Sequence, residues 1–214
     1  MVRITDTSRE MRDNLAREFF LEANKRVRRN AKSGLAQAKA ATLHFLTNTD
    51  TYRSLVSGEL AAHFGFIKGE SVLRPILNTF VESIHYRFDP FSQNKGSFSF
   101  LGILDDYSDV FSLDSAYIKG KNKPGITTQY PLPWLNWLLL QGDAILVKDY
   151  HIEIGGLKSR SGEAIMVRGG NWKIPSGFGG TAANNWITRM SPKGTKAITE
   201  YDKTLERILE GLLV

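Results

Sequence analysis

Apolar residues recur at helical spacing over the N-terminal part of the chain. An imperfect apolar stripe runs through residues 9–46 among good helix formers, and it consists of Leu15, Phe19, Val27, Leu35, Ala38, Leu43 and Leu46. This spacing predicts one long helix, which Gly34 is expected to weaken or bend. The short polar side chains of residues 47–50 compete with helical hydrogen bonds and predict where the helix ends.

Two further helices are predicted before residue 85. Residues 52–65 form a short helix that is entered through Ser57 or Gly58 and ends at Gly65. The next helix has Ser71 as its N-cap and Pro75 early enough to cost little. Its apolar residues follow the i, i+3, i+4, i+7, i+8, i+11 spacing of one helix face: Leu73, Ile76, Leu77, Phe80, Val81 and Ile84.

From residue 85 to residue 104 the period of the apolar pattern changes toward two, which predicts strands. The aromatic and apolar positions flank a turn at residues 89–96, with Tyr86 and Phe88 before it and Phe98, Phe100 and Ile103 after it. Residues 105–125 are expected to be rich in loops, with an exposed tip at residues 119–125.

The pattern after residue 131 predicts a helix and then a hairpin. Residues 134–140 are almost wholly apolar and predict a helix that Gly142 closes. Residues 145–154 alternate as a long strand. The turn residues up to Gly162 lead to a return strand at 164–168.

Two helices are predicted after the hairpin. A short one lies near residues 184–189, and the terminal one carries its apolar residues on one side: Ile198, Tyr201, Leu205, Ile208, Leu209 and Leu212. We expect this terminal helix to dock on the sheet.

Together these elements predict an α+β fold, with a long N-terminal helix, further helices packed on a small, mostly antiparallel sheet, and a C-terminal helix. No linker or repeat is apparent, so residues 1–214 are predicted to form one domain. Its parts are a basic helical arm (1–47), a strand and loop region (85–125), and a helix, hairpin and C-terminal helix (131–214).

Composition removes several classes of chemistry. The chain has 214 residues and no cysteine, which excludes disulfides, thiolate catalysis and cysteine-ligated metals. It contains no signal-peptide pattern and no stretch of about 18 apolar residues, so we expect a soluble protein made in the cytoplasm, without a membrane partner.

Positive charge is concentrated near the N-terminus. The net charge is +6, and residues 1–40 hold ten basic and five acidic residues, a net of +5. Lys25, Arg26, Arg28 and Arg29 are candidates for contact with DNA phosphates, because cations on one rod displace counterions together. A solvated helix face and an acidic neighbouring subunit are the alternatives. No helix-turn-helix, zinc-finger or RNP-type motif accompanies these residues.

No motif for catalysis, for a metal or for a cofactor is present in the sequence. We therefore predict a protein that is not an enzyme and that binds neither a metal nor a cofactor. The four histidines are scattered and match no metal-binding frame, and the glycines match no phosphate-binding loop. The remaining enzymatic alternative is a hydrolase that uses paired carboxylates, with Asp105, Asp106 or Asp109 acting beside Glu153 or Glu163.

Five segments resemble the neck and tail-completion proteins of tailed bacteriophages. They are residues 58–65 (GELAAHFG), 132–143 (LPWLNWLLLQGD), 159–166 (SRSGEAIM), 172–175 (WKIP) and 178–189 (FGGTAANNWITR). The likeness covers most of the chain in order. It departs from the smaller siphophage tail components in residues 89–125 and in the tryptophan-rich helix.

The resemblance implies a ring-forming structural subunit at the head–tail junction of a virion, assembled in the host cytoplasm. It acts as a neck, tail-completion or tail-terminator protein. Its implied partners are copies of itself, neighbouring neck, connector or tail-tube proteins, and genomic DNA passing through the lumen. We expect subunit contacts in the C-terminal turns, at Ser159, Arg160, Ser161, Gly162, Trp172 and Phe178. A basic nucleic-acid-binding module and a virion-associated hydrolase remain the alternatives.

Overall fold

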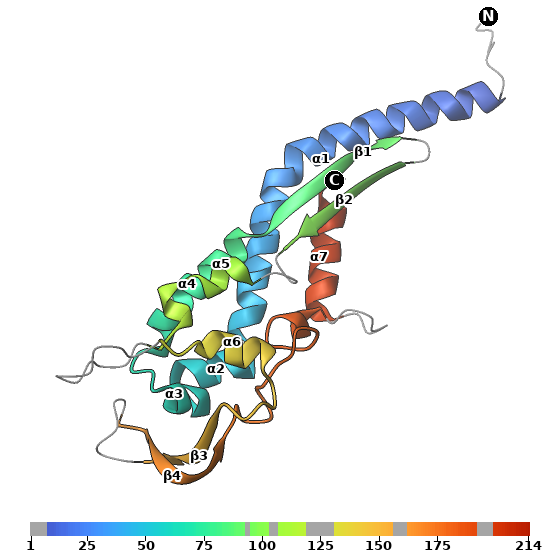
Figure 1. The fold of residues 1–214 in the computed structure, drawn as a ribbon. Coiled ribbons are helices and arrows are strands. Elements are labelled where there is room, and N and C mark those ends of the chain that lie inside the picture. The colour runs from blue at the N-terminus through green and yellow to red at the C-terminus, as the bar shows by residue number, and fades with distance from the viewer. Residues whose placement is uncertain (1–7, 93–94, 103–106, 119–130, 156–161, 192–198) are drawn as a thin grey trace, which may run out of the picture.

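One long helix, α1 (Ser8–Thr47), runs through most of the length of the elongated molecule (Figure 1). The computed structural model describes residues 8–92, 95–102, 107–118, 131–155, 162–191 and 199–214. The C-terminal half of α1 belongs to a helical body, whereas its N-terminal end projects away from that body. The predicted long helix is confirmed.

The helices that follow α1 form the body. They are α2 (Asp50–Ser57), α3 (Glu59–Phe64), α4 (Gly69–Glu82), α5 (Ser108–Phe111), the 3-10 turn η1 (Asp114–Ala116) and α6 (Trp134–Leu140). Their apolar faces meet around side chains with no exposed surface, among them Leu46, Leu55, Leu60, Leu73 and Trp134. Truncating a leucine at such a site to alanine typically destabilises a protein by about 2–5 kcal/mol.

The helix predicted at residues 52–65 is divided into α2 and α3, and its predicted end at Gly65 is confirmed. Thr49 caps α2 by accepting the Tyr52 N–H, and its hydroxyl also accepts the Trp186 indole N–H at 2.8 Å. Gly58 separates α2 from α3, and Gly65 ends α3 in the left-handed conformation at φ 66°. Gly65 therefore ends α3 through its own backbone conformation, whereas the division at Gly58 was not predicted.

Helix α4 begins earlier than predicted. It starts at Gly69, with Lys68 as its N-cap, whereas the hydroxyl of Ser71 donates to the Lys68 carbonyl. The chain enters α4 against the backbone of α2, because a Cβ at position 69 would lie 2.1 Å from the Leu55 carbonyl oxygen. The prediction of Ser71 as N-cap was wrong because a tertiary contact places the start of the helix.

The described residues contain two antiparallel hairpins. In the first, β1 (His85–Ser92) pairs with β2 (Lys95–Leu101), so the predicted turn at 89–96 is shorter than expected. In the second, β3 (Val147–Ile154) pairs with β4 (Ala164–Trp172), which extends beyond the predicted return strand. The first hairpin lies along α1, and the second lies at the end of the molecule opposite the projecting end of α1 (Figure 1). The α+β class is thus confirmed.

Helix α7 (Glu200–Gly211) packs on α1, which corrects the prediction that it docks on a sheet. The Asn30 amide donates to the Leu212 carbonyl at 3.1 Å, and the hydroxyls of Thr42 and Tyr201 lie 2.9 Å apart. Gly34 makes the close approach possible, because a Cβ there would lie 2.6 Å from Leu212 Cδ2. Small residues on α1 therefore select the partner of α7.

The predicted short helix at residues 184–189 is replaced by turns and a 3-10 helix, η2 (Thr188–Met190). The side-chain oxygen of Asn185 accepts the backbone N–H groups of Ile187 and Thr188 at 2.9 and 3.1 Å. An asparagine that binds the following backbone in this way favours a turn over an α-helix.

Candidate assembly surfaces

An apolar row continues along α1 after the helix leaves the body. Val27 and Ala31 are each 1% exposed against the rest of the protein. At four-residue intervals toward the N-terminus lie Ala23 at 8% exposure, Phe19 at 66%, Leu15 at 71% and Met11 at 40%. Large apolar side chains on a helix normally face a packed partner. We call residues 8–22 the arm, and Met11, Leu15 and Phe19 the apolar row.

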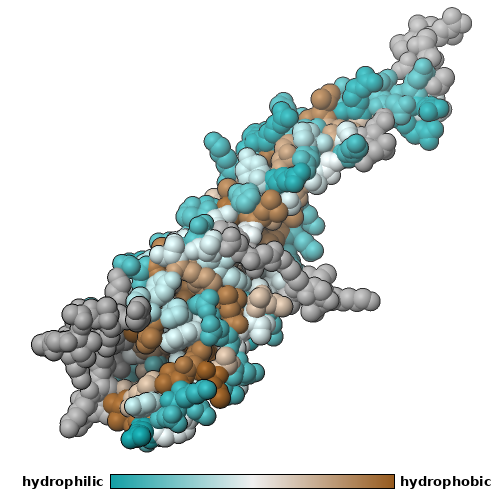
Figure 2. Space-filling view, in the orientation of Figure 1, coloured by the Kyte–Doolittle hydropathy of each residue, from teal (hydrophilic) through white to brown (hydrophobic). Residues whose placement is uncertain are grey.

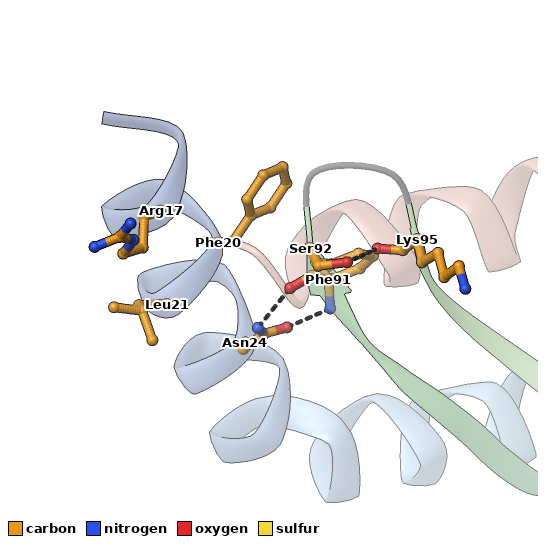
Figure 3. Close-up of a pocket in the computed structure, with 7 residues that line it drawn as sticks. All are labelled: Arg17, Phe20, Leu21, Asn24, Phe91, Ser92 and Lys95. Atoms are coloured by element: carbon orange, nitrogen blue, oxygen red, sulfur yellow. Dashed lines mark hydrogen bonds between the residues drawn. The ribbon is translucent and has the colours of Figure 1, made fainter. Parts of the chain in front are cut away.

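Hydrogen bonds to the first hairpin fix the point at which the arm leaves the body. The Asn24 amide donates to the Phe91 carbonyl at 3.0 Å and accepts the Phe91 N–H at 2.7 Å (Figure 3). Phe91 lies where the β1–β2 register shifts, so it has no partner on the opposite strand. The side-chain amide of Asn24 takes the place of that missing strand partner.

An open groove of about 580 Å³ lies between the arm and the tip of this hairpin. Arg17, Phe20, Leu21 and Asn24 line it from one face of α1, and Phe20 and Asn24 point toward the hairpin (Figure 3). Lys95 points away from α1, so the two cations do not converge. A site for a small anion needs convergent donors. The groove is therefore better suited to a macromolecular contact.

Cations line the side of α1 that faces away from the body. Lys25, Arg28, Arg29 and Lys32 are exposed and follow the i, i+3, i+4, i+7 spacing of one helix face. Among the residues that the structure describes, none forms an ion pair with these four. We call them the basic face. Lys32 is not among the predicted contacts, although its seven-residue spacing from Lys25 places it on the same face.

Arg26 belongs elsewhere, which corrects its place among the candidate DNA contacts. Its guanidinium pairs with Glu22 at 2.9 Å and donates to the carbonyl of Leu213 at 2.9 Å. The hydrogen bond from Arg26 lowers the pKa of the Glu22 carboxyl. Arg26 therefore joins α1 to the residues after α7.

The predicted subunit contacts differ in their positions. Ser159, Arg160 and Ser161 lie outside the described residues. Gly162 is exposed, with a φ of 80°. Phe178 is half-buried and packs against the core.

Trp172 is a core residue, which corrects its prediction as a subunit contact. It is 6% exposed, and its ring packs edge-on against Phe64 and Trp137. Its indole N–H donates to His63 Nδ1 at 3.3 Å. The side chain therefore offers little surface to a second subunit.

A second exposed apolar surface lies on the β3–β4 hairpin. Register pairs Ile152 with Met166 and places Tyr150 and Ile154 on the same face. Ile152 is partly buried against the core, whereas Tyr150, Met166 and Ile154 are 42%, 48% and 68% exposed. Hydrophobic residues gather along the arm and again at the hairpin end of the molecule (Figure 2). We call these four residues the hairpin face. The predicted contacts lie mainly in the turns and do not include these four residues.

Two histidines have shifted pKa values. Burial lowers the pKa of His63, although Glu59, 3.9 Å from its Nε2, acts in the opposite direction. The carbonyl of Gly169, 2.8 Å from His151 Nδ1, raises the pKa of His151, and Glu153 adds to this effect from 3.2 Å. Burial therefore accounts for the lowered pKa of His63, and hydrogen bonds account for the raised pKa of His151.

Of the carboxylates proposed for a hydrolase, the described ones lie on different segments of the chain. Asp105 and Asp106 lie outside the described residues. Asp109 is exposed on α5, and Glu153 is exposed on β3 beside His151. The described residues also contain no group of three or more histidine, aspartate or glutamate side chains placed to hold a metal ion.

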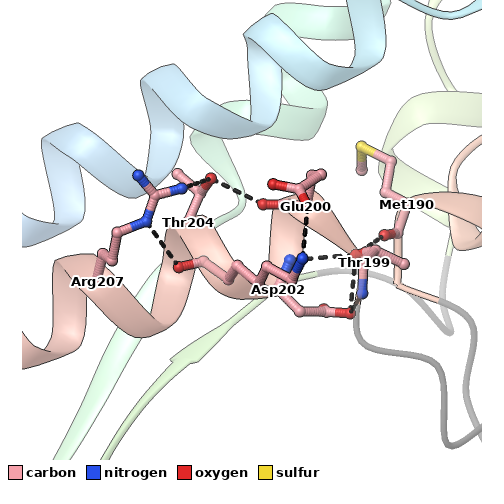
Figure 4. Close-up of polar contacts among 7 residues, drawn as sticks. Met190, Thr199, Glu200, Asp202, Thr204 and Arg207 are labelled. Atoms are coloured by element: carbon pink, nitrogen blue, oxygen red, sulfur yellow. Dashed lines mark hydrogen bonds and ion pairs between the residues drawn. The ribbon is translucent and has the colours of Figure 1, made fainter.

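The carboxylate of Asp202 has a structural role at the start of α7 (Figure 4). It accepts the Thr199 N–H at 2.9 Å and the Ser191 hydroxyl at 2.7 Å, while Thr199 Oγ1 accepts the Asp202 N–H. Partial burial raises the pKa of Asp202, but the hydrogen bonds from Ser191 and Thr199 outweigh it and lower the pKa. This capping box fixes the first turn of the helix that packs on α1.

Within the described part of the chain, no helix combines the length and apolar character that crossing a bilayer requires. No known protein family, curated protein or solved structure matches the chain.

Proposed function

We propose that this protein is a structural assembly subunit that forms a ring at the head–tail junction of a tailed phage, as a neck, tail-completion or tail-terminator protein. The observation that carries the proposal is the exposed apolar row on the projecting arm. Burying a leucine or phenylalanine side chain completely gains about 1.5–3 kcal/mol. A partner that covers Leu15 and Phe19 therefore gains several kcal/mol.

The surfaces of the chain suit ring closure. A ring needs two different surfaces on each subunit, which meet head to tail. The apolar row and the hairpin face are two such surfaces, and they lie at opposite ends of the molecule. The basic face gives the subunit a moderate positive stripe, which attracts passing DNA through phosphate contacts that salt weakens.

Electron microscopy of particles assembled without this protein tests the proposal. Full heads and finished tails that remain unjoined support it, and intact infectious particles contradict it. Supplying the wild-type chain is expected to restore joining, whereas Leu15→Asp is not. Asn14→Asp is the matched control, because it adds the same charge at an exposed polar position of the arm.

The basic face favours a second candidate function, which is binding to nucleic acid. Binding is expected to weaken with salt, with a slope of about −0.9 for each phosphate contacted. Replacing Lys25, Arg28, Arg29 and Lys32 by glutamine is then expected to reduce the slope by about 3–4. The control replaces four exposed cations outside α1, namely Arg53, Lys68, Arg74 and Lys173. Equal slopes for both variants contradict a role for the basic face.

A further inference from the structure

The two uncovered apolar surfaces share one structural origin. Each follows on from a residue that the body buries or partly buries: the apolar row begins one helical turn before Ala23, which is 8% exposed, and the hairpin face includes Ile152, which is partly buried. Each becomes exposed where its element extends beyond the body. The arm and the β3–β4 hairpin lie at opposite ends of the molecule, so one chain does not bring its own two surfaces together (Figure 1).

We infer that the apolar row of one copy docks on the hairpin face of the next copy. This inference rests on the proposed function, and it names the two surfaces that meet in the ring. A pocket of about 220 Å³ lies where the hairpin face borders the body, lined by Leu132, Ile152 and Met166 among others. Leu132 and Met166 are themselves 48% exposed. The pocket offers an apolar seat for a side chain of the arm.

Charge supports the same pairing. Glu18 follows Leu15 by three residues, so it lies beside the apolar row. Arg168 is the register partner of Tyr150, which places it on the hairpin face. Both are exposed, and neither forms an ion pair with another described residue. A carboxylate beside one surface and a guanidinium beside the other complement each other in a head-to-tail contact.

This contact predicts complementation between two defective variants. Leu15→Asp blocks the arm and leaves the hairpin face intact, whereas Ile154→Asp does the reverse. By size-exclusion chromatography with light scattering, each full-length variant alone is expected to be monomeric, with a dissociation constant weakened at least about tenfold. An equimolar mixture is expected to form 1:1 dimers and no larger species, because one intact surface remains on each partner.

Matched controls separate the contact from a general effect of charge. Asn14→Asp adds one negative charge to the arm, and Asn171→Asp adds one to β4 while it keeps the oxygen that accepts the Asp149 N–H. Both are expected to assemble like the wild type. Circular dichroism verifies that each variant is folded. If either aspartate variant does not fold, the charge reversals Glu18→Arg and Arg168→Glu are used in its place. Each single reversal is expected to weaken assembly, and a chain that carries both reversals is expected to recover it.

The outcomes distinguish this inference from the proposed function. If the wild type assembles and Ile154→Asp assembles equally well, the arm docks elsewhere and only the inference is overturned. The same holds if the two folded variants do not form dimers on mixing. A wild-type chain that stays monomeric at every concentration overturns the proposed function, and the inference with it.

Discussion

Replacing Asn24 by alanine removes the side chain that pairs with the unpartnered backbone of Phe91. The two hydrogen bonds, at 2.7 and 3.0 Å, each contribute about 0.5–1.5 kcal/mol net, or about 1–3 kcal/mol together. Alanine has the higher helix propensity, which returns about 0.5 kcal/mol. The expected net loss in the free energy of unfolding is therefore about 0.5–2.5 kcal/mol.

The assay combines urea unfolding with amide hydrogen exchange of β1 and β2. Asn14→Ala is the matched control, because Asn14 is an exposed asparagine on the same helix. It is expected to leave stability unchanged or raise it by a few tenths of a kcal/mol. Only Asn24→Ala is expected to speed exchange in the first hairpin. Equal stabilities for the two variants, with unchanged exchange, would refute the role assigned to Asn24.

Three further predictions concern stability: two depend on pH, and one concerns the cap of α7. The folded protein lowers the pKa of His63 from its ordinary 6.5, so the unfolded chain takes up the proton first. The contribution of His63 to stability is then full above pH 6.5 and falls as the pH drops below that value. Urea unfolding from pH 8 to 5 measures this change. The same pH dependence in His63→Gln would contradict the prediction. At the start of α7, Thr199→Ala is expected to destabilise the protein by about 1 kcal/mol in thermal unfolding at neutral pH. The lowered pKa of Asp202 adds stability that is present above the ordinary pKa of 3.8 and is lost as the pH falls through the pKa in the folded protein. An unchanged acid unfolding profile in Asp202→Asn would argue against this contribution.

The elements that the sequence predicted well are those fixed by local spacing. Helix α1 follows from apolar residues at helical intervals, and the end of α3 follows from Gly65. The packing partner of α7 could not be predicted from the sequence, because an amphipathic helix indicates that one side is buried without indicating which element covers that side. Contact between Gly34 and Leu212 decides that, and the two residues are far apart in the sequence.

The candidate site was predicted only in part for a related reason. Adjacent cations on a helix point in different directions, so Arg26 turns to Glu22 while Lys25 and Lys32 share a face. The sequence predicts Trp172 as a subunit contact because its burial depends on helices from other parts of the chain. The spacing of cations within α1 predicts the basic face, whereas no local sequence pattern predicts that Trp172 is buried.

Native mass spectrometry of the purified chain tests the central claim of self-assembly most directly. A ring predicts one closed species at a fixed multiple, above two, of the 24.0 kDa subunit mass, and its loss in Leu15→Asp but not in Asn14→Asp. A spectrum that holds only the 24.0 kDa species at every concentration would contradict the account.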